Sequence, residues 1–184
     1  MTAGRGLMAP PAPAGWVRID GVRTEIWLPS GFEGGDVEED LPLIVENLRH
    51  LGNDFSPFVE AIEANPDSID LIAYDTQSLA GGVFTNVVIA GERVPSAIDA
   101  GDYLEILTSR LPDTFVVLDQ RELDDDTVFA NLRLDLSGAV VMRQRIYLTK
   151  REGMIWSVGF TSSEVEFDDR RGAFEVAFSR FRLK

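Results

Sequence analysis

The residues best suited to binding chemistry are three arginines and a tyrosine in the second half of the chain: Arg133, Arg143, Arg145 and Tyr147. A guanidinium group holds a carboxylate or a phosphate through two parallel hydrogen bonds, and a tyrosine can stack on a ligand or hydrogen-bond to it. The four side chains can act together only if the chain brings them to one surface. The elements that carry them must therefore be worked out first.

The four residues fall in two segments of alternating polarity, 127–136 and 140–149, which predict the strands of a hairpin. Pairing Leu136 with Val140 leaves a three-residue loop in which Gly138 can adopt a positive φ angle. This register collects the apolar side chains on one face, whereas a slip of one residue would turn arginines into that layer. We therefore predict the first register.

On the opposite face, this register places Arg133 across from Arg143, Arg145 next to Asn131 and Tyr147 near Phe129. We expect a three-residue turn, Arg151 to Gly153, before the following strand, so that its small residues Ser157 and Gly159 lie on the same face, with Gly159 as the floor of a shallow basic pocket. Like charges that face each other across a ladder cost free energy unless an anion lies between them. If that anion is a ligand carboxylate or phosphate, the pocket is a binding site.

The alternative is that the protein neutralises its own arginines. Asp135 is on the same face of the hairpin, and Asp168, Asp169 and Glu175 belong to the last predicted helix. We favour this internal pairing, because a chain with fourteen surplus acidic groups rarely leaves arginines unpaired.

The other polar motifs match no catalytic or metal-binding pattern. The acidic runs Asp36–Asp40 and Asp124–Asp126 lack the spaced ligands of an EF-hand, so solvated turns are favoured over calcium sites. His50 has no G-x-S-x-G serine motif to activate, and a cation at a helix C-terminus is explained by the helix dipole. Gly81-Gly82 and Gly91 form neither a dinucleotide fingerprint nor a P-loop. We predict no catalytic residue, no metal and no cofactor.

Composition narrows the classes of function further. The chain has 184 residues, 45% hydrophobic and 26% charged, which suits one globular domain with a substantial core. Its formal net charge of −14 opposes binding to nucleic acid or to an anionic membrane surface. The absence of cysteine and the single histidine exclude disulfides, thiolate metal sites and multi-histidine metal sites.

The chain divides into a flexible arm rich in proline and alanine, residues 1–15, and one domain, residues 16–184. No apolar run approaches the roughly 18 residues needed to span a bilayer, and the arm has no signal-peptide pattern. The sequence as it stands predicts a cytoplasmic protein. An export signal or a lipid-anchoring cysteine ahead of it would make the protein extracytoplasmic instead.

Periodicity predicts the order of strands and helices. Strands are expected at 16–20, 22–28, 69–75, 83–90, 115–122, 127–136, 140–149 and 154–161, with a tight turn at Asp20-Gly21. Helices are expected over 41–51 and 54–65, after Pro95-Ser96, and after a capping pattern at Ser163 and Glu166. This order predicts an α+β fold in which helices flank a largely antiparallel sheet of six to seven strands.

Four segments carry a resemblance to a known fold: GVRTEIWLPSGFEG, DYLEILTSRLPDTFVVL, MRQRIYLTKREGMIWSVGFTSS and FEVAFSRFRL. Together with the order of elements over residues 16–182, they resemble the PsbP-like superfamily, the α/β/α sandwich of the extrinsic photosystem proteins, the yeast Ran-binding Mog protein and bacterial LpqN-type lipoproteins. The resemblance implies an accessory, scaffolding or partner-binding role rather than catalysis.

Three functions follow as hypotheses. The first is a non-catalytic binding or assembly module whose partner is another protein, with a homodimer allowed. The second is a cytosolic chaperone for an exported hydrophobic client, similar to Eag-type adaptors, which would need a contiguous exposed apolar groove. The third is a small enzyme that orients an anionic substrate with Arg133, Arg143 and Tyr147, and it would need a carboxylate or a histidine near them.

Overall fold

The computed structural model describes residues 13–35, 37, 41, 42, 46, 60, 66–78, 83–136 and 140–184. Several predicted features lie outside these residues: most of the N-terminal arm, most of the two helices expected between residues 41 and 65, most of the first acidic run, His50, Gly81-Gly82 and Gly138.

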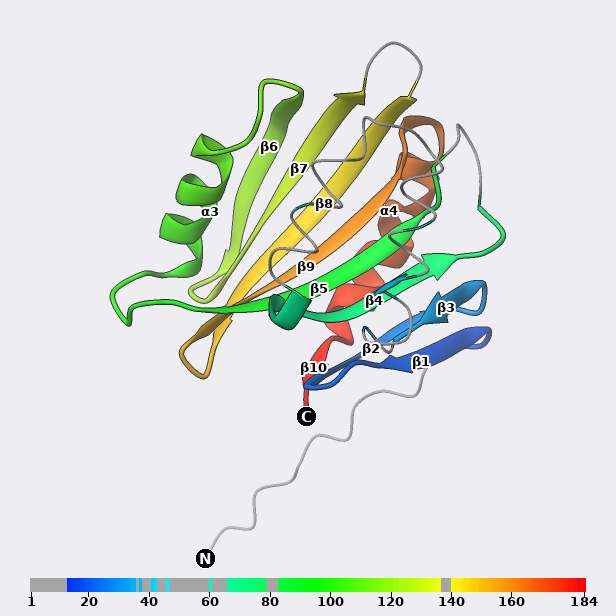
Figure 1. Ribbon diagram of the computed structural model, residues 1–184, viewed down its shortest axis with the longest axis horizontal. Helices are drawn as coiled ribbons and strands as arrows, with labels where there is room; N and C mark the ends of the chain where they lie inside the picture. Colours follow the sequence, from blue (N-terminus) through cyan, green and yellow to red (C-terminus); the bar gives the residue numbers. More distant parts are fainter. Residues whose placement is uncertain are drawn as a thin grey trace, which may run out of the picture.

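The described strands form two antiparallel sheets (Figure 1). The large sheet has the order β3-β4-β5-β9-β8-β7-β6, made of Phe32–Gly34, Ile69–Asp75, Asn86–Arg93, Met154–Ser163, Val140–Arg151, Thr127–Leu136 and Phe115–Asp124. The small sheet has the order β1-β2-β10, made of Trp16–Asp20, Thr24–Pro29 and Arg182–Leu183. A short 3-10 helix, η2 (Pro66–Ser68), leads into β4.

The two described α-helices cover opposite faces of the large sheet. Helix α3 (Ala100–Ser109) packs on β7 and β8, where its Leu104 joins Ala130 and Leu148 in one apolar cluster. Helix α4 (Glu164–Ser179) packs on the other face against β8, β9 and β2. The small sheet lies on the same face as α4. The predicted α+β fold, with a sheet of six to seven strands flanked by helices, is confirmed.

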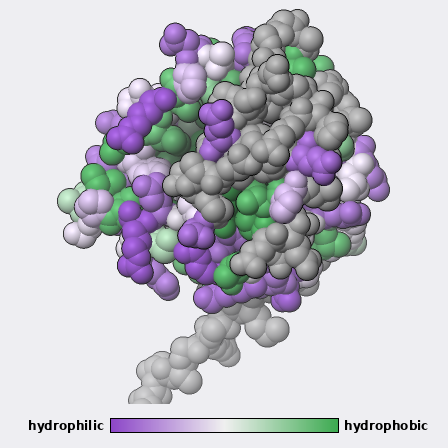
Figure 2. Space-filling view, in the orientation of Figure 1, coloured by the Kyte–Doolittle hydropathy of each residue, from purple (hydrophilic) through white to green (hydrophobic). Residues whose placement is uncertain are grey.

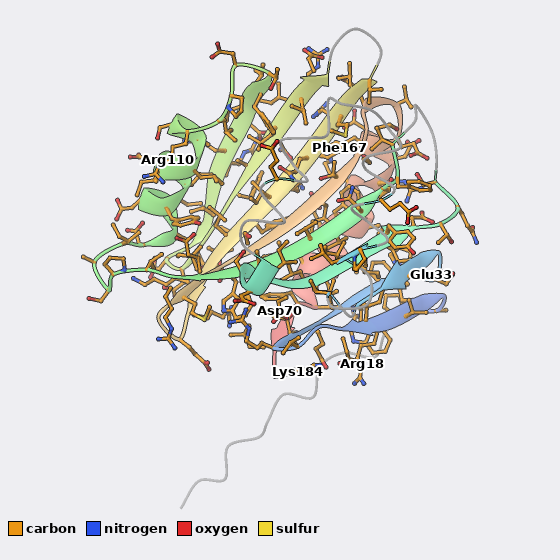
Figure 3. The ribbon with its side chains drawn as sticks, in the orientation of Figure 1. Arg18, Glu33, Asp70, Arg110, Phe167 and Lys184 are labelled. Atoms are coloured by element: carbon orange, nitrogen blue, oxygen red, sulfur yellow. The ribbon has the colours of Figure 1, made fainter. Side chains whose placement is uncertain are left out.

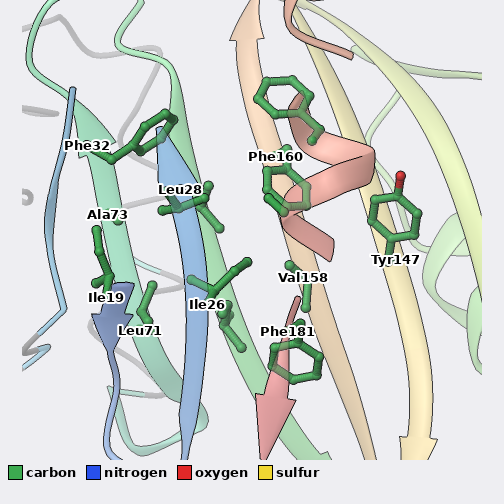
Figure 4. Packing of buried hydrophobic residues seen from close by; sticks show 14 of the residues in the cluster. Ile19, Ile26, Leu28, Phe32, Leu71, Ala73, Tyr147, Val158, Phe160 and Phe181 are labelled. Carbon is green, nitrogen blue, oxygen red and sulfur yellow. The ribbon is translucent and has the colours of Figure 1, made fainter. Parts of the chain in front are cut away.

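The main core fills the space between α4, the small sheet and the large sheet (Figure 4). Phe160 of β9 stacks on Phe174 of α4 with ring centroids 4.9 Å apart, and Ile26 and Leu28 of β2 are almost fully buried beside them. Large aromatic side chains contribute most of the buried apolar area in a core of this size, so this cluster fixes α4 on the sheet.

Helix α3 begins with a capping box, because the Asp99 carboxylate accepts from the Asp102 backbone N–H and the Asp102 carboxylate accepts from that of Asp99. The capping box predicted for α4 is wrong. Ser163 is its N-cap residue but makes no side-chain cap hydrogen bond. The Glu166 carboxylate is instead held by the hydroxyl of Ser78, at 2.7 Å.

The turn between β1 and β2 also differs from the prediction. Asp20 pairs with Glu25, and the Gly21 N–H donates to the Thr24 carbonyl, so the turn residues are Val22 and Arg23. Gly21 does not have a positive φ angle. It is needed for space, because a Cβ atom there would lie 2.5 Å from the backbone oxygen of Asp70 on β4.

Asp70 links the two sheets at this point (Figure 3). Its buried carboxylate accepts from the Arg23 backbone N–H, the Arg23 Nε and the Thr24 hydroxyl, the last at 2.6 Å. These hydrogen bonds replace the hydration that the buried Asp70 carboxylate loses on folding.

None of the described helices is long and apolar enough to cross a membrane.

Candidate functional site

The register predicted for the β7–β8 hairpin is confirmed. Leu136 pairs with Val140, and along the same ladder Arg133 faces Arg143 and Asn131 faces Arg145. The three arginines and Tyr147 therefore share the face of the large sheet on which α4 packs. Helix α4 brings carboxylates to this face, and these carboxylates decide what the arginines can do.

Arg145 is buried, with 6% of its surface exposed. Its Nε donates to Asn131 Oδ1 at 2.8 Å, and its Nη1 donates to Glu175 Oε1 of α4 at 2.5 Å. Its guanidinium also lies over the ring of Phe129, 4.7 Å from the centroid. A buried cation with an ion pair, a polar neighbour and an aromatic face beneath it is a structural group that holds α4 to the sheet.

Tyr147 lies next to Arg145 and stacks almost parallel on Phe178 of α4, with centroids 3.9 Å apart. Its hydroxyl is 3.5 Å from Arg145 Nη1. Burial raises the pKa of Tyr147, although the Arg145 charge acts in the opposite direction. The side chain is therefore an uncharged part of the core (Figure 4) and not an activated phenolate.

Arg133 and Arg143 share one carboxylate, that of Glu164 in the first turn of α4. Arg133 Nε lies 3.0 Å from Glu164 Oε2, and a second ion pair of 3.2 Å joins Arg133 to Asp135. Arg143 Nη1 is 3.8 Å from Glu164, and its guanidinium lies 4.6 Å from the ring centroid of Phe167. The buried Arg143 Nε has no hydrogen-bond partner among the described residues.

The internal pairing favoured from the sequence is thus confirmed for Asp135 and Glu175. Asp168 pairs instead with Arg171 on its own helix. The sequence pattern does not indicate two further carboxylates of this network: Glu164, which pairs with Arg133 and Arg143, and Asp119. Asp119 of β6 accepts from the Asn131 amide at 2.5 Å and so extends the network to the edge strand. Its place on the same face follows from its pairing with Asn131, which a bulge in β6 makes hard to predict.

The expected floor of the pocket is wrong. Gly159 pairs with Ile146, and Ser157 pairs with Leu148, so both small residues lie on the opposite face, the one that α3 covers. The reason is the turn between β8 and β9, which has two residues rather than three: Arg151 pairs with Met154. One residue fewer in a hairpin loop moves every following side chain to the other face. Val158 and Phe160 take those places instead.

No group of three or more metal-ligating side chains gathers among the described residues. In the turn Asp124–Asp126 all three aspartates are exposed, and the Asp126 backbone N–H donates to the Asp124 carboxylate.

Each of the three guanidinium groups, those of Arg133, Arg143 and Arg145, already has a carboxylate of the protein beside it. The arrangement is therefore a set of ion pairs between α4 and the sheet, with Arg133 and Glu164 at its solvent-accessible end.

The described sheets and α-helices, in this order, have the Mog1/PsbP-like fold, and solved structures that share it include the following three. Cyanobacterial PsbP (CyanoP) from Synechocystis is 15% identical, covers 98% of this chain and 99% of its own, and has a TM-score of 0.59. The Saccharomyces cerevisiae Ran-binding protein Mog1p is 7% identical, with coverages of 91% and 95% and a TM-score of 0.54. LpqN of Mycobacterium tuberculosis, involved in cell envelope biogenesis, is 10% identical, with coverages of 92% and 90% and a TM-score of 0.53.

These similarities confirm the predicted fold resemblance, and at such low identity they show the fold alone. The sequence itself matches no protein-family model and no curated protein.

Proposed function

We propose that this protein is a non-catalytic binding or assembly module that acts through protein–protein contacts. The observation that carries the proposal is the pairing of Arg133, Arg143 and Arg145 with carboxylates of the same chain. An enzyme or an anion receptor needs such groups free to meet a substrate. The proposal is supported by the fold, whose members are mostly non-catalytic binding proteins.

The contact surface in this proposal lies on the α4 face of the large sheet, between the first turn of α4 and the edge strand β6. Arg133 stands there directly opposite Val116 of β6, which is 46% exposed, and Glu164 and Asp135 flank the arginine. An exposed apolar residue surrounded by charged groups is the usual composition of a protein-binding surface. In this role the solvent-exposed parts of the Arg133 and Arg143 side chains contact the partner. The buried side chains of Arg145 and Tyr147 fix the position of the strand that carries this surface.

The alternatives have less support. An enzyme would need a free carboxylate or histidine near the arginines, whereas Glu164 and Glu175 are both engaged in ion pairs. A chaperone for a hydrophobic client would need a contiguous apolar groove, whereas the exposed apolar side chains of β6 lie along a strand edge.

Two measurements test the proposal. The purified protein is assayed against general hydrolase, phosphatase and nuclease substrates, and turnover that is abolished by changing one polar residue would overturn the proposal.

In parallel, binding of a partner that co-purifies from the native cell is measured for the wild type and for the variants Arg133→Glu and Val116→Asp. We expect both variants to weaken binding at least about tenfold, while Arg171→Glu on the outer side of α4 leaves binding unchanged.

A further inference from the structure

Strand β6 forms an edge of the large sheet, and its outer side has no partner among the described strands. It is ten residues long, whereas the strand at the other edge, β3, has three. A long edge strand presents a row of unpaired N–H and C=O groups, which is a template for another strand. Among the described residues, the outer side of β6 is therefore the longest backbone surface left open to a further strand.

The side chains of β6 support the same conclusion. Four large apolar residues of this strand are exposed by 39% to 51%: Val116, Val117, Leu118 and Leu123. Figure 2 shows hydrophobic residues among hydrophilic ones at the surface on the side of the molecule where α3 and β6 lie. Three consecutive exposed apolar residues are unusual in an isolated soluble domain and mark an interaction surface.

Helix α3 packs on the first residue of β6, Phe115, but leaves the middle of this edge uncovered. Gln120 and Glu122 pair with Ala130 and Val128, so they point to the α3 side of the sheet, yet both are exposed. The helix lies over β7 and β8 instead. A strand could therefore approach β6 from outside without displacing α3.

We propose that the occupant is a second copy of this chain, with two β6 strands paired antiparallel about a two-fold axis at Gln120. In this register Asp119 of each copy faces Arg121 of the other. Within the regular segment the pairing thus gives two opposite-charge pairs, and it also sets Leu118 of each copy opposite Glu122 of the other. Moving the axis by one residue in either direction would oppose two Asp119 or two Arg121 side chains, which is unfavourable.

The shape of the strand fits a closed dimer. The two register shifts in β6 fall between Val117 and Asp119 and between Glu122 and Asp124, on either side of the regular segment at the proposed axis. Neighbouring strands are about 4.8 Å apart, so the two β7 strands would be about 14 Å apart. This is wider than the 8–10 Å that packed helices need, so the two α3 helices would not collide.

The dimer goes beyond the proposed function but is compatible with it. Strand pairing uses the backbone of β6, and the side chains of Val116 and Arg133 on the sheet face stay accessible. Two partner-binding faces would then lie side by side around the axis. Binding to a partner does not require the dimer, so the two proposals can fail independently.

A charge exchange tests the dimer. The mass in solution is measured by sedimentation equilibrium over a concentration series for the wild type, R121D, D119R and an equimolar mixture of the two variants. We expect the wild type to approach twice the chain mass of 20.4 kDa, and each variant alone to associate at least about tenfold more weakly, because like charges then oppose each other. The mixture should restore association, because each Asp–Arg pair is rebuilt between unlike copies.

The control is Arg171→Asp, which makes the same charge change on α4 and should leave the mass unchanged. Circular dichroism confirms folding of each variant, and recovery of association in the mixture shows that both variants are folded. A wild type that stays at 20.4 kDa throughout, an R121D that associates like the wild type, or a mixture that stays monomeric would overturn the dimer. A monomeric wild type would refute the dimer but not the proposed binding function. Turnover that depends on one polar residue would refute the non-catalytic binding function but not the dimer.

Discussion

The Arg145 guanidinium of β8 lies 2.5 Å from the Glu175 carboxylate of α4, although the arginine side chain is 7% exposed and the glutamate side chain is 56% exposed. The pair therefore joins a core position to the surface of the helix. If the glutamate is lost, the arginine cannot reach water, whereas the glutamate is hydrated without the arginine. The arginine consequently depends on α4 more than α4 depends on the arginine.

Replacing this arginine should weaken the fold. Arg145→Ala removes the bond to Asn131 Oδ1, the ion pair to Glu175 and the packing on Phe129. We expect the free energy of unfolding to fall by about 2–4 kcal/mol, since a buried acceptor loses its donor and a cavity opens. Urea denaturation measures the loss.

The matched control is Arg171→Ala on α4, which removes the same side chain where it is 54% exposed. We expect a change below about 0.5 kcal/mol there. Equal losses for the two variants would contradict the structural role of Arg145.

Tyr147 should make the protein sensitive to alkali. Burial raises its pKa in the folded state, so above the usual tyrosine pKa of about 10 the unfolded chain releases a proton that the folded protein keeps. The stability that Tyr147 contributes is full below that pH and is lost as the pH rises toward the folded-state pKa. Tyr147→Phe should therefore lose less stability than the wild type between about pH 9 and 11.

Tyr103 must be separated from this effect, because burial and the neighbouring Glu92 raise its pKa too. The urea midpoint is measured across the same pH range for Tyr147→Phe, Tyr103→Phe and the double variant. The double variant should show the flattest profile. A Tyr147→Phe profile as steep as that of the wild type would show that the tyrosine does not couple folding to pH.

Two glycines should respond in opposite ways to alanine. At Gly21 the new Cβ would lie 2.5 Å from the Asp70 backbone oxygen and 2.7 Å from its carboxylate. We expect Gly21→Ala to cost about 1–3 kcal/mol, because backbone on both sides must move. At Gly172 inside α4 nothing lies within 4 Å of the new atom, and Gly172→Ala should stabilise by about 0.5–1 kcal/mol through helix propensity. Thermal unfolding of both variants tests the pair, and a shift of the same sign in each would contradict this account.

Sequence reasoning predicted the fold class and the β7–β8 register because alternating polarity and a favoured loop pointed to the same answer. One slip would have buried Arg143 and Arg145 in the apolar layer, so only one register was acceptable. The next hairpin gave no such signal. Ser157 and Gly159 are small and suit either face, so the pattern could not show that the turn had two residues rather than three.

The carboxylates that pair with the arginines were predicted only in part for a related reason. The sequence indicates Glu175, together with Asp168 and Asp169, as an acid of the last helix that can reach the arginines, and the phenylalanine spacing of that helix predicts the helix itself. Glu164 lies at the first position of that helix, and its side chain position depends on how the helix starts against β9. Packing between elements decides this, and sequence spacing alone does not record it.

The turn between β8 and β9 leads to the last prediction. Glu152 has a φ angle of 54° and Gly153 one of 75°, which are the values of a two-residue type I′ turn. Such a turn favours asparagine followed by glycine, and a glutamate with positive φ is strained. We expect Glu152→Asn to raise the free energy of unfolding by about 0.5–1 kcal/mol, because asparagine tolerates this conformation. Glu152→Val, with a β-branched side chain at the same angle, should lower it, and urea denaturation of both variants measures the difference. If valine were tolerated as well as asparagine, the turn would not have this conformation in solution, and the register that places Gly159 on the α3 face would lose its support.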